Sequence, residues 1–305
     1  MSPHIHINDP RWLKTPAGED RGYIQPKTLK ELWFHTGTIC NLSCPFCLEG
    51  SKPGDGRLDQ IDLDDIVPFV NEALTLGVEK FSFTGGEPFV TKDMLKILGH
   101  CLELRACMVL TNGTRPLLMR LEEIKKLKQK PHPLHFRVSI DYADSRCHDA
   151  SRGHGNFQLA LQSAGQLHRW GFRVSIARQR QKGEDINKVD AGFAPVLKAA
   201  SLPVDTKIVS FPDLLTPGAG AKGPHITENC MTTHHTEESR ERFMCAFSKM
   251  IVKRNGQMRV YACTLVDDDE DYDLGGSLTQ AMPVRVMMKH QRCYACFAQG
   301  ASCSE

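Results

Sequence analysis

Three cysteines stand close together in the segment TICNLSCPFCLEG (38–50), where Cys40, Cys44 and Cys47 follow the spacing C-x3-C-x2-C. Three thiolates can hold three irons of a four-iron cluster and leave one iron open to another ligand. A zinc ion with three thiolates and a water molecule satisfies the same count. The spacing therefore indicates a metal centre with an open position. The apolar Phe46 beside Cys47 favours an iron–sulfur cluster that is shielded from water.

A second group of cysteines lies in the C-terminal part of the sequence. Residues 225–305 contain Cys230, Cys245, Cys263, Cys293, Cys296 and Cys303. The stretch KRNGQMRVYAC (253–263) predicts a hairpin around Gly256 that brings Cys245 and Cys263 together, and a C-x2-C pair follows. Four thiolates can close a metal cluster, which would stabilise a segment with little regular pattern. A structural zinc site is the alternative.

Short apolar runs alternate with helical patterns in the middle of the chain. The predicted strands are 30–37, 78–86, 107–113, 134–141, 172–179 and 205–211, and the predicted helices are about 62–76, 93–104, 117–128, 156–170 and 186–200. This alternation indicates an α/β fold with a parallel sheet, either an open doubly wound sheet or a partial (β/α) barrel. We expect a polar, Pro-rich and loose lead-in at 1–28, an α/β domain at 29–211 and an extension at 212–305.

Functional loops of such folds follow the carboxyl ends of the strands. The first cysteine group begins just after the first predicted strand. The stretch FSFTGGEPFV (81–90) places Gly85, Gly86, Glu87 and Pro88 at the end of the second strand. Glycines let a backbone approach a ligand closely, and a glutamate can accept charge-assisted hydrogen bonds from an ammonium group.

These two motifs, in this order on these strands, resemble the radical S-adenosylmethionine (radical SAM) superfamily. The resemblance covers about residues 30–211 and implies a partial (β/α)6 barrel. It implies that Cys40, Cys44 and Cys47 hold a [4Fe-4S] cluster whose open iron binds SAM. It also implies that the motif Gly85-Gly86-Glu87-Pro88 holds the methionyl amine of SAM.

Other positions match the same superfamily pattern. Ser139 and Asp141 end the fourth strand, where the resemblance implies contacts to the SAM ribose. Arg152, in HDASRGHGNF (148–157), corresponds to an arginine that meets the SAM carboxylate. Ordinary alternatives are a strand end for the first two residues and a surface charge for Arg152.

The cysteine-rich tail resembles the SPASM/twitch extensions of that superfamily. The resemblance implies a second, auxiliary [4Fe-4S] cluster, held by Cys245, Cys263, Cys293 and Cys296. Cys230 or Cys303 could replace one of these four. The full SPASM run of cysteines is missing, so we expect one auxiliary cluster rather than two.

The resemblance implies a radical SAM enzyme that reductively cleaves SAM to a 5′-deoxyadenosyl radical and abstracts hydrogen from a substrate. We expect an unidentified small metabolite as substrate, and an external electron donor such as flavodoxin or ferredoxin. One alternative is a maturase that modifies a peptide or protein. Another is a non-catalytic iron–sulfur or zinc protein, although such a protein has no use for a SAM amine site.

Composition and charge limit the partners and the cellular compartment that we expect for this protein. The formal net charge of +2 gives no sign of a nucleic-acid partner. The N-terminal residues show no signal-peptide pattern, and no apolar run is long enough for a membrane helix, so we expect a cytoplasmic protein with reduced thiols. The isolated Cys101, Cys107 and Cys147 are expected to be packed thiols, and the run DDDEDYD (267–273) to be a solvated loop.

Overall fold

The computed structural model describes residues 9–219 and 223–300. Their contacts divide the chain into two units. The barrel unit comprises residues 34–66 and 80–216, and the cysteine-rich unit comprises the described parts of 1–33, 67–79 and 217–305. Strand β2 (Glu31–His35) and helix α2 (Leu63–Thr75) have residues in both units.

The barrel unit is built on parallel strands that follow one another in chain order. These are β3 (Lys80–Thr84), β4 (Ala106–Thr111), β5 (Leu134–Ser139), β6 (Arg173–Gln179) and β7 (Ile208–Phe211), each paired in parallel with the next. Strand β2 lies next to β3, and β7 ends the sheet. All six predicted strands are therefore present. The sheet is open at β7, as the expected partial barrel requires.

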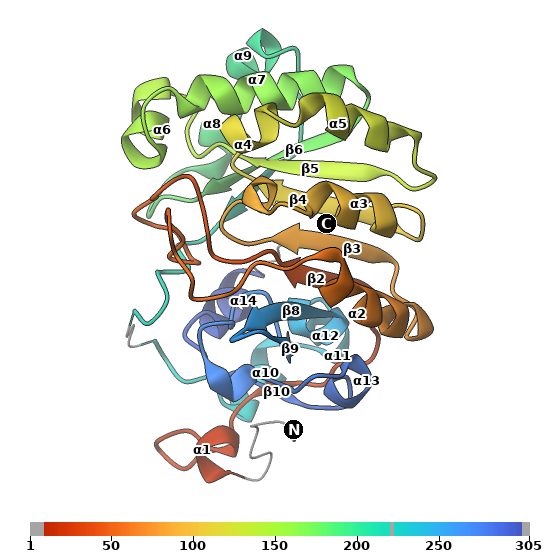
Figure 1. The fold of residues 1–305 in the computed structure, drawn as a ribbon. Helices are drawn as coiled ribbons and strands as arrows, with labels where there is room; N and C mark the ends of the chain where they lie inside the picture. Colours follow the sequence, from red (N-terminus) through yellow and green to blue (C-terminus); the bar gives the residue numbers. More distant parts are fainter. Residues whose placement is uncertain (1–8, 220–222, 301–305) are drawn as a thin grey trace. The chain divides into compact units, whose positions relative to one another are not determined.

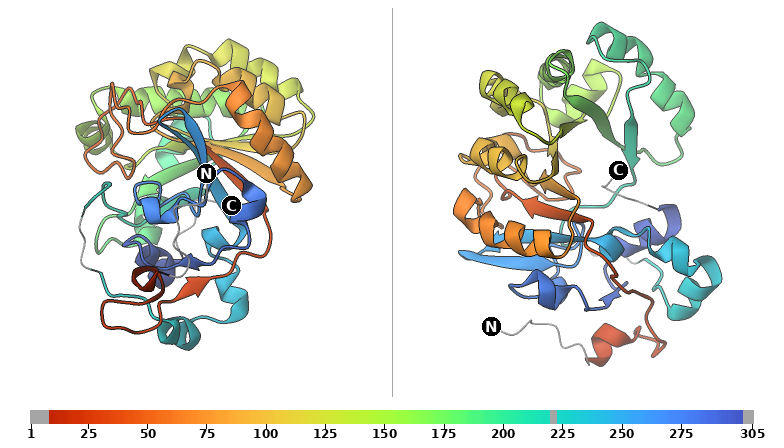
Figure 2. Two further views of the ribbon diagram at one scale, coloured as in Figure 1. Left: turned by 60° about the horizontal axis from the view of Figure 1, so that its bottom comes forward. Right: turned by 90° about the vertical axis from the view of Figure 1, so that its right-hand side faces the viewer.

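Helices connect these strands and pack beside them (Figure 1). They are α3 (Met94–Cys101), α4 (Arg115–Leu118), α5 (Leu121–Lys126), α6 (Ser145–Arg152), α7 (Asn156–Arg169), α8 (Ile186–Ala191) and α9 (Ala194–Ala199), with the short 3-10 helices η1 (Pro88–Val90) and η2 (Leu127–Gln129). Figure 2 shows the yellow and green helices outside the strands that they connect. Helix α7 packs on β5 and β6, which fixes the strand ends that carry Ser139.

Two predicted helices are each divided into shorter helices. The prediction of one helix at 186–200 is wrong at Gly192 and Phe193, where α8 ends and α9 begins. Pro195 lies in the first turn of α9 and lacks the N–H that a continuous helix needs. The predicted helix at 117–128 is likewise divided into α4, α5 and η2. Helix α6 has no counterpart among the predicted helices.

The core of the barrel unit lies along both faces of the strands. Phe81, Phe83, Met108, Phe136 and Ile176 have no exposed surface. Strands buried on both faces read as nearly continuous apolar runs, as expected for a parallel sheet covered by helices. The strand ends, where polar residues begin, are left to form a site.

The cysteine-rich unit contains the predicted hairpin. Strands β8 (Ser248–Arg254) and β9 (Gln257–Tyr261) pair antiparallel. Asn255 and Gly256 between them have φ values of 51° and 73°, which an Asn-Gly turn accommodates. The other helices of this unit are α10 (Glu228–His234), α11 (Glu237–Arg240), α12 (Met244–Phe247), η3 (Glu270–Tyr272), α13 (Leu278–Ala281) and α14 (Cys293–Gln299).

The N-terminal segment is packed from residue 9 onward rather than loose. Helix α1 (Pro10–Leu13) precedes strand β1 (Tyr23–Ile24), which pairs antiparallel with β10 (Val286–Met287). The buried Arg21 donates hydrogen bonds to the carbonyls of Trp12 and Lys14. Composition alone could not show this, because the partner strand is distant in the sequence.

Across 9–219 and 223–300, none of the helices combines the length and the apolar character that crossing a membrane requires.

One carboxylate caps a helix from a distant part of the sequence. Glu72 on α2 accepts hydrogen bonds from the Ser277 hydroxyl at 2.7 Å and from the N–H groups of Leu278 and Thr279 at 2.9 and 2.8 Å. These groups begin α13, where backbone N–H groups lack helical partners. Burial raises the pKa of Glu72, but the bonds from Thr279, Ser277 and Leu278 outweigh it and lower the pKa.

We predict that Glu72→Gln costs about 1 kcal/mol of unfolding free energy at pH 7, as for loss of an N-cap. Asn71→Ala, on an exposed neighbour, is the control and should change little. Because the pKa of Glu72 is lowered on folding, its contribution is present above the ordinary value of 4.5 and declines as the pH falls below it. Urea unfolding of parent and variant at pH 7 and pH 4 measures both effects, and a difference that does not depend on pH contradicts the prediction.

Candidate functional site

A cavity of about 180 Å³ lies at the carboxyl ends of the parallel strands in the barrel unit. Its lining comes from the loop after β2 and from the ends of β3 to β7. Among the lining residues are Cys40, Cys44, Cys47, Gly85, Gly86, Ser139, Asp141 and Arg152. The structure thus brings together most of the positions that the sequence singled out. Glu87 and Pro88 do not line the cavity.

The three thiols at this cavity are shielded from water. Burial raises the pKa of Cys40 to about 12, and it also raises the pKa values of Cys44 and Cys47. Such thiols lose their protons only when a cation takes the protons' place, which is what metal coordination does. The donor set therefore fits a metal centre better than a free nucleophile.

A chain of side chains holds Cys40. Asn112 Nδ2 lies 3.8 Å from the Cys40 Sγ and donates to Asn41 Oδ1 at 3.0 Å, while Thr114 Oγ1 donates to Asn112 Oδ1 at 2.6 Å. The Leu42 N–H also points to the Cys40 Sγ, at 3.4 Å. Asn41 was not predicted as a site residue from the sequence. Asparagines just after β2 and just after β4 were the available signal.

Gly85 and Gly86 allow the loop that carries Cys40 to lie close to the end of β3. A Cβ at Gly86 would lie 2.3 Å from the Ile39 carbonyl oxygen, and a Cβ at Gly85 would lie 2.7 Å from the Gly37 carbonyl oxygen. Gly85 has a φ of 142°, which other residues rarely adopt. The N–H of Gly86 donates to Gly37 and the N–H of Glu87 to Ile39. The glycines are needed for backbone-to-backbone contact as well as for any ligand.

Glu87 connects the end of β3 to the end of β4 through hydrogen bonds. Its carboxylate accepts hydrogen bonds from the Thr111 hydroxyl at 2.8 Å, the Asn112 N–H at 2.8 Å and the Phe89 N–H at 3.1 Å. Burial raises the pKa of Glu87 to about 7, against the lowering effect of these bonds. Both carboxylate oxygens are thus already engaged, so this geometry makes Glu87 a support for the wall of the cavity.

Asp141 and Arg152 form an ion pair in the cavity wall. Arg152 Nε donates to Asp141 Oδ2, and the Gln179 N–H donates to Asp141 Oδ1 at 2.9 Å. The Arg152 guanidinium lies 5.6 Å from the centre of the Phe46 ring, which belongs to the cysteine loop. Burial lowers the pKa of Arg152, but Asp141 and Cys44 raise it further. A permanent positive charge is therefore held beside two of the three thiols.

Arg178, at the end of β6, also lines the cavity. Its Nη1 meets Glu184 at 2.6 Å and its Nε meets Asp190 at 2.8 Å. The neighbouring Ser175 bonds to His135 at 2.9 Å. Arg178 is thus neutralised by the chain, so it presents little net charge to a ligand.

A buried acid next to Cys47 escaped sequence reasoning. Glu49 Oε2 accepts from His35 Nε2 at 3.0 Å and from Arg57 Nη2 at 3.1 Å. The Gly37 N–H donates to His35 Nδ1, so the proton of the ring lies on Nε2 and faces Glu49. A glutamate two residues after the last cysteine was the signal, and the structure shows that it anchors the end of the loop.

The cysteine-rich unit brings the other four thiols together. Cys245, Cys263, Cys293 and Cys296 line one small cavity, with apolar walls from Phe243, Met244, Leu265, Val266, Val286 and Met288. Burial raises the pKa of Cys293 to about 12 and also raises the pKa values of Cys245 and Cys263. Cys230 does not line this cavity and accepts a contact from the Thr227 hydroxyl at 3.2 Å. Cys303 lies outside the described residues.

Tyr272 holds the backbone that leads to Cys293. Its hydroxyl donates to the Met287 carbonyl at 2.7 Å and accepts the N–H groups of Lys289 at 3.0 Å and His290 at 2.7 Å. The same hydroxyl lies 3.8 Å from the Cys293 Sγ. Such supporting contacts orient metal ligands.

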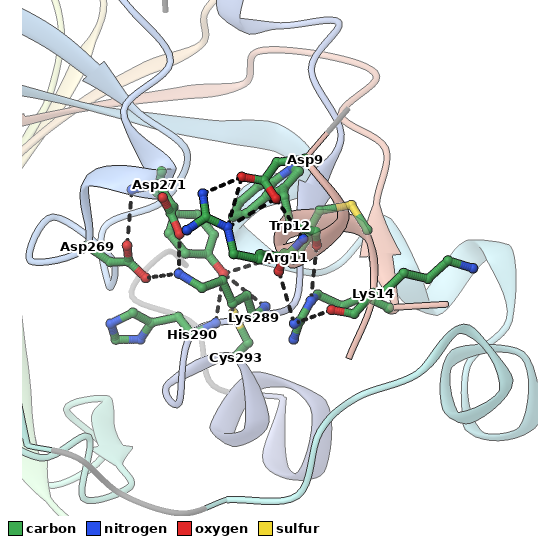
Figure 3. A network of polar contacts seen from close by, with 12 residues as sticks. Asp9, Arg11, Trp12, Lys14, Asp269, Asp271, Lys289, His290 and Cys293 are labelled. Atoms are coloured by element: carbon green, nitrogen blue, oxygen red, sulfur yellow. Dashed lines mark hydrogen bonds and ion pairs between the residues drawn. The ribbon is translucent and has the colours of Figure 1, made fainter. Parts of the chain in front are cut away.

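The expectation that the acidic run 267–273 is a solvated loop is wrong for Asp267, Asp268, Asp269 and Asp273, whereas Glu270 and Asp271 are exposed. Lys289 meets Asp269 at 3.1 Å and also meets Asp271, as Figure 3 shows. Asp268 meets His290 at 3.1 Å; burial raises its pKa, but His290 and Arg292 lower it to about 2. Asp273 meets Arg259 at 2.8 Å. Ion pairs from this run hold residues 289–292 in place, immediately before Cys293.

The three isolated cysteines differ in their surroundings. Cys101 and Cys107 are buried, as predicted, but Cys147 is exposed on α6, so the prediction of a packed thiol is wrong there.

Comparison with known proteins agrees with this fold. Residues 34–178 match the Radical SAM superfamily. GTP 3′,8-cyclase of Actinobacillus pleuropneumoniae is 30% identical over 140 residues, which are 44% of this chain and 39% of the cyclase. The antilisterial bacteriocin subtilosin biosynthesis protein AlbA of Bacillus subtilis is 31% identical over 140 residues, 45% of this chain and 30% of AlbA. The chain thus spans well under half the length of these relatives.

Streptococcus suis SuiB is similar in fold. Its structure bound to the precursor peptide SuiA gives a TM-score of 0.61 at 14% identity, covering 84% of this chain and 65% of SuiB. Its structure bound to S-adenosylmethionine gives a TM-score of 0.60. An open parallel α/β sheet brings three thiols and a glycine-rich strand end to one cavity. Residues 34–178 of this chain match the Radical SAM superfamily, and SuiB shares the fold.

We predict that Gly86→Ala lowers the unfolding free energy by about 1–3 kcal/mol, the usual cost of overpacking, because its Cβ would meet the Ile39 carbonyl oxygen. Gly99→Ala on α3 is the matched control, since its Cβ would find only contacts of 3.9 and 4.0 Å. The control should raise stability by about 1 kcal/mol through helix propensity. Urea unfolding of both variants measures the effects, and equal shifts would show that the close approach is unimportant.

Proposed function

We propose that this protein is an enzyme that reductively cleaves S-adenosylmethionine and uses the resulting 5′-deoxyadenosyl radical to abstract hydrogen from a substrate. One observation carries the proposal. The three thiols, the Gly85-Gly86 strand end and the Asp141–Arg152 pair all line a single cavity at the carboxyl ends of the parallel strands. A non-catalytic metal protein has no need for this arrangement.

In this proposal Cys40, Cys44 and Cys47 hold a [4Fe-4S] cluster with one open iron, and SAM occupies the cavity beside it. When bound, the cluster supplies the one electron that breaks SAM into methionine and the 5′-deoxyadenosyl radical. Asn112 orients the Cys40 sulfur, and Glu49 fixes the end of the loop after Cys47.

Polar groups around the cavity suit the functional groups of SAM. Arg152 provides positive charge for the carboxylate, and Ser139 and Asp141 offer oxygen atoms for the ribose hydroxyls. The methionyl amine meets the backbone of Gly85 and Gly86, while Glu87 supports that backbone from behind and adds negative charge. Apolar Leu42, Phe46, Leu48, Leu110, Phe211 and Leu214 exclude water from the cavity.

We further propose that Cys245, Cys263, Cys293 and Cys296 hold an auxiliary [4Fe-4S] cluster. Support comes from the convergence of the four thiols on one apolar cavity. A cluster with four thiolates has no open iron, so it would carry electrons rather than bind SAM.

The proposed substrate is a small, largely neutral molecule. The charged side chains Glu49, Asp141, Arg152 and Arg178 at the cavity all have partners of opposite charge within the chain. An apolar or neutral group is therefore the better match for the remaining wall. An external electron donor of the flavodoxin or ferredoxin type completes the proposed reaction.

A peptide is the second candidate substrate. SuiB, which shares this fold, is described bound to a precursor peptide, and AlbA takes part in bacteriocin biosynthesis. Incubation of the reduced enzyme with cell extract separated into small-molecule and peptide fractions, followed by mass spectrometry, distinguishes the two candidates. A mass change that depends on SAM in one fraction identifies the substrate class.

We predict that anaerobically reconstituted, reduced protein converts SAM to 5′-deoxyadenosine, whereas the Cys40/Cys44/Cys47→Ala triple variant forms none above background. The reason is that without these thiolates no open iron can bind SAM. Cys147→Ser, at an exposed position outside both cavities, should retain full activity. Chromatography of the products measures this, and equal cleavage by the triple variant would refute the assignment.

The same triple variant tests the auxiliary cluster. We predict that it retains about four irons per chain, the content of one [4Fe-4S] cluster, and that its spectrum does not change when SAM is added. Adding Cys293→Ala to it should lower the iron content and increase proteolysis of the cysteine-rich unit, because metal binding contributes folding energy. Zinc in place of iron, or no metal, would rule out the cluster.

A further inference from the structure

Lys249 is a buried cation in the cysteine-rich unit. It lies on β8, four residues after Cys245, and has no exposed surface. Its Nζ donates to the carbonyl oxygens of Cys245 and Ser248, both at 3.2 Å. Lysine is almost never fully buried unless it is paired.

The surroundings of Lys249 lack the usual partner. In the part of the chain that the structure describes, no carboxylate lies within 4.0 Å of its Nζ. Two neutral carbonyls compensate only part of the cost of burying an ammonium group. Burial lowers the pKa of Lys249 to about 8, and the neighbouring thiols of Cys245 and Cys263 oppose this lowering.

This arrangement makes sense if an anion forms at those thiols. Four thiolates around an oxidised [4Fe-4S] core outweigh its positive charge, so the cluster as a whole is negative. Coulomb attraction across a buried, apolar site is weakly screened. The negative cluster would then take the place of the missing carboxylate beside the ammonium and would offset the cost of burying the lysine.

We propose that Lys249 is the electrostatic counter-charge of the auxiliary cluster and raises its reduction potential. The inference rests on the auxiliary cluster proposed above. Reduction adds one electron to the core, taken from a substrate radical or from a chemical reductant, and breaks no bond. Because the added charge is negative, a neighbouring ammonium stabilises the reduced cluster more than the oxidised one. This favours the cluster as an electron acceptor when a substrate is oxidised.

The test uses the Cys40/Cys44/Cys47→Ala background, in which only the auxiliary cluster remains to be observed. Lys249→Gln removes the charge but can still donate hydrogen bonds to both carbonyls, whereas Lys249→Met removes both. Lys253→Met, on the same strand at a half-buried position, is the control for loss of one positive charge. Iron content and EPR-monitored titration with dithionite measure occupancy and midpoint potential.

We expect both Lys249 variants to shift the midpoint to a more negative potential. The reduction equilibrium should change at least about tenfold, which is 59 mV for a one-electron couple. Lys253→Met should shift it much less. If Lys249→Met misfolds, Lys249→Gln carries the comparison alone because it keeps the hydrogen bonds.

The two proposals fail in different ways. Iron that is retained with an unchanged midpoint in Lys249→Gln overturns the role of Lys249 and leaves the cluster standing. A background variant without iron, or with zinc, overturns the auxiliary cluster and this inference with it. A shift of equal size in Lys253→Met would also overturn the inference, because it would show a general charge effect rather than one from the buried ammonium.

Discussion

The site of the barrel unit depends on one backbone contact, the approach of the cysteine loop to the end of β3. The N–H groups of Gly86 and Glu87 donate to the carbonyls of Gly37 and Ile39, at 2.9 and 3.1 Å. A side chain at either glycine would collide with this loop. The loop that carries Cys40 is therefore attached directly to the strand end, and every other feature of the cavity is arranged around that attachment.

Support for this contact extends to the next strand. Glu87 leaves the strand end and accepts hydrogen bonds from Thr111 and Asn112 at the end of β4. Asn112 then turns its amide toward the Cys40 sulfur and Asn41. One acid, buried at a cost that raises its pKa to about 7, thus couples the glycine turn to the thiol. Rigid positioning of this kind is what an open metal site requires.

Many charged side chains in both units lie beside a group of opposite charge. In the barrel unit, Asp141 with Arg152 and Arg178 with Glu184 bring their own partners to the cavity wall. In the cysteine-rich unit, the acidic run meets Lys289, His290 and Arg259 and fixes the segment before Cys293. Lys249 and Arg21 depart from this pattern, because both donate hydrogen bonds to backbone carbonyls. The proposal for Lys249 follows from this departure.

The sequence by itself predicted the positions of the six strands, the hairpin at Gly256 and the cysteines of both groups, because these depend on local periodicity, turn chemistry and spacing. It could not show that residues 9–28 pack against the C-terminal part, since β1 finds its partner β10 far along the chain. The sequence also could not show that the Glu87 carboxylate accepts hydrogen bonds from Thr111 and Asn112. It could not show that carboxylates of the acidic run form ion pairs. Those facts depend on which side chains meet in space. Tertiary structure alone decided them, because the partner of a buried charged group comes from a distant part of the chain. The local sequence does not say which residue that partner is.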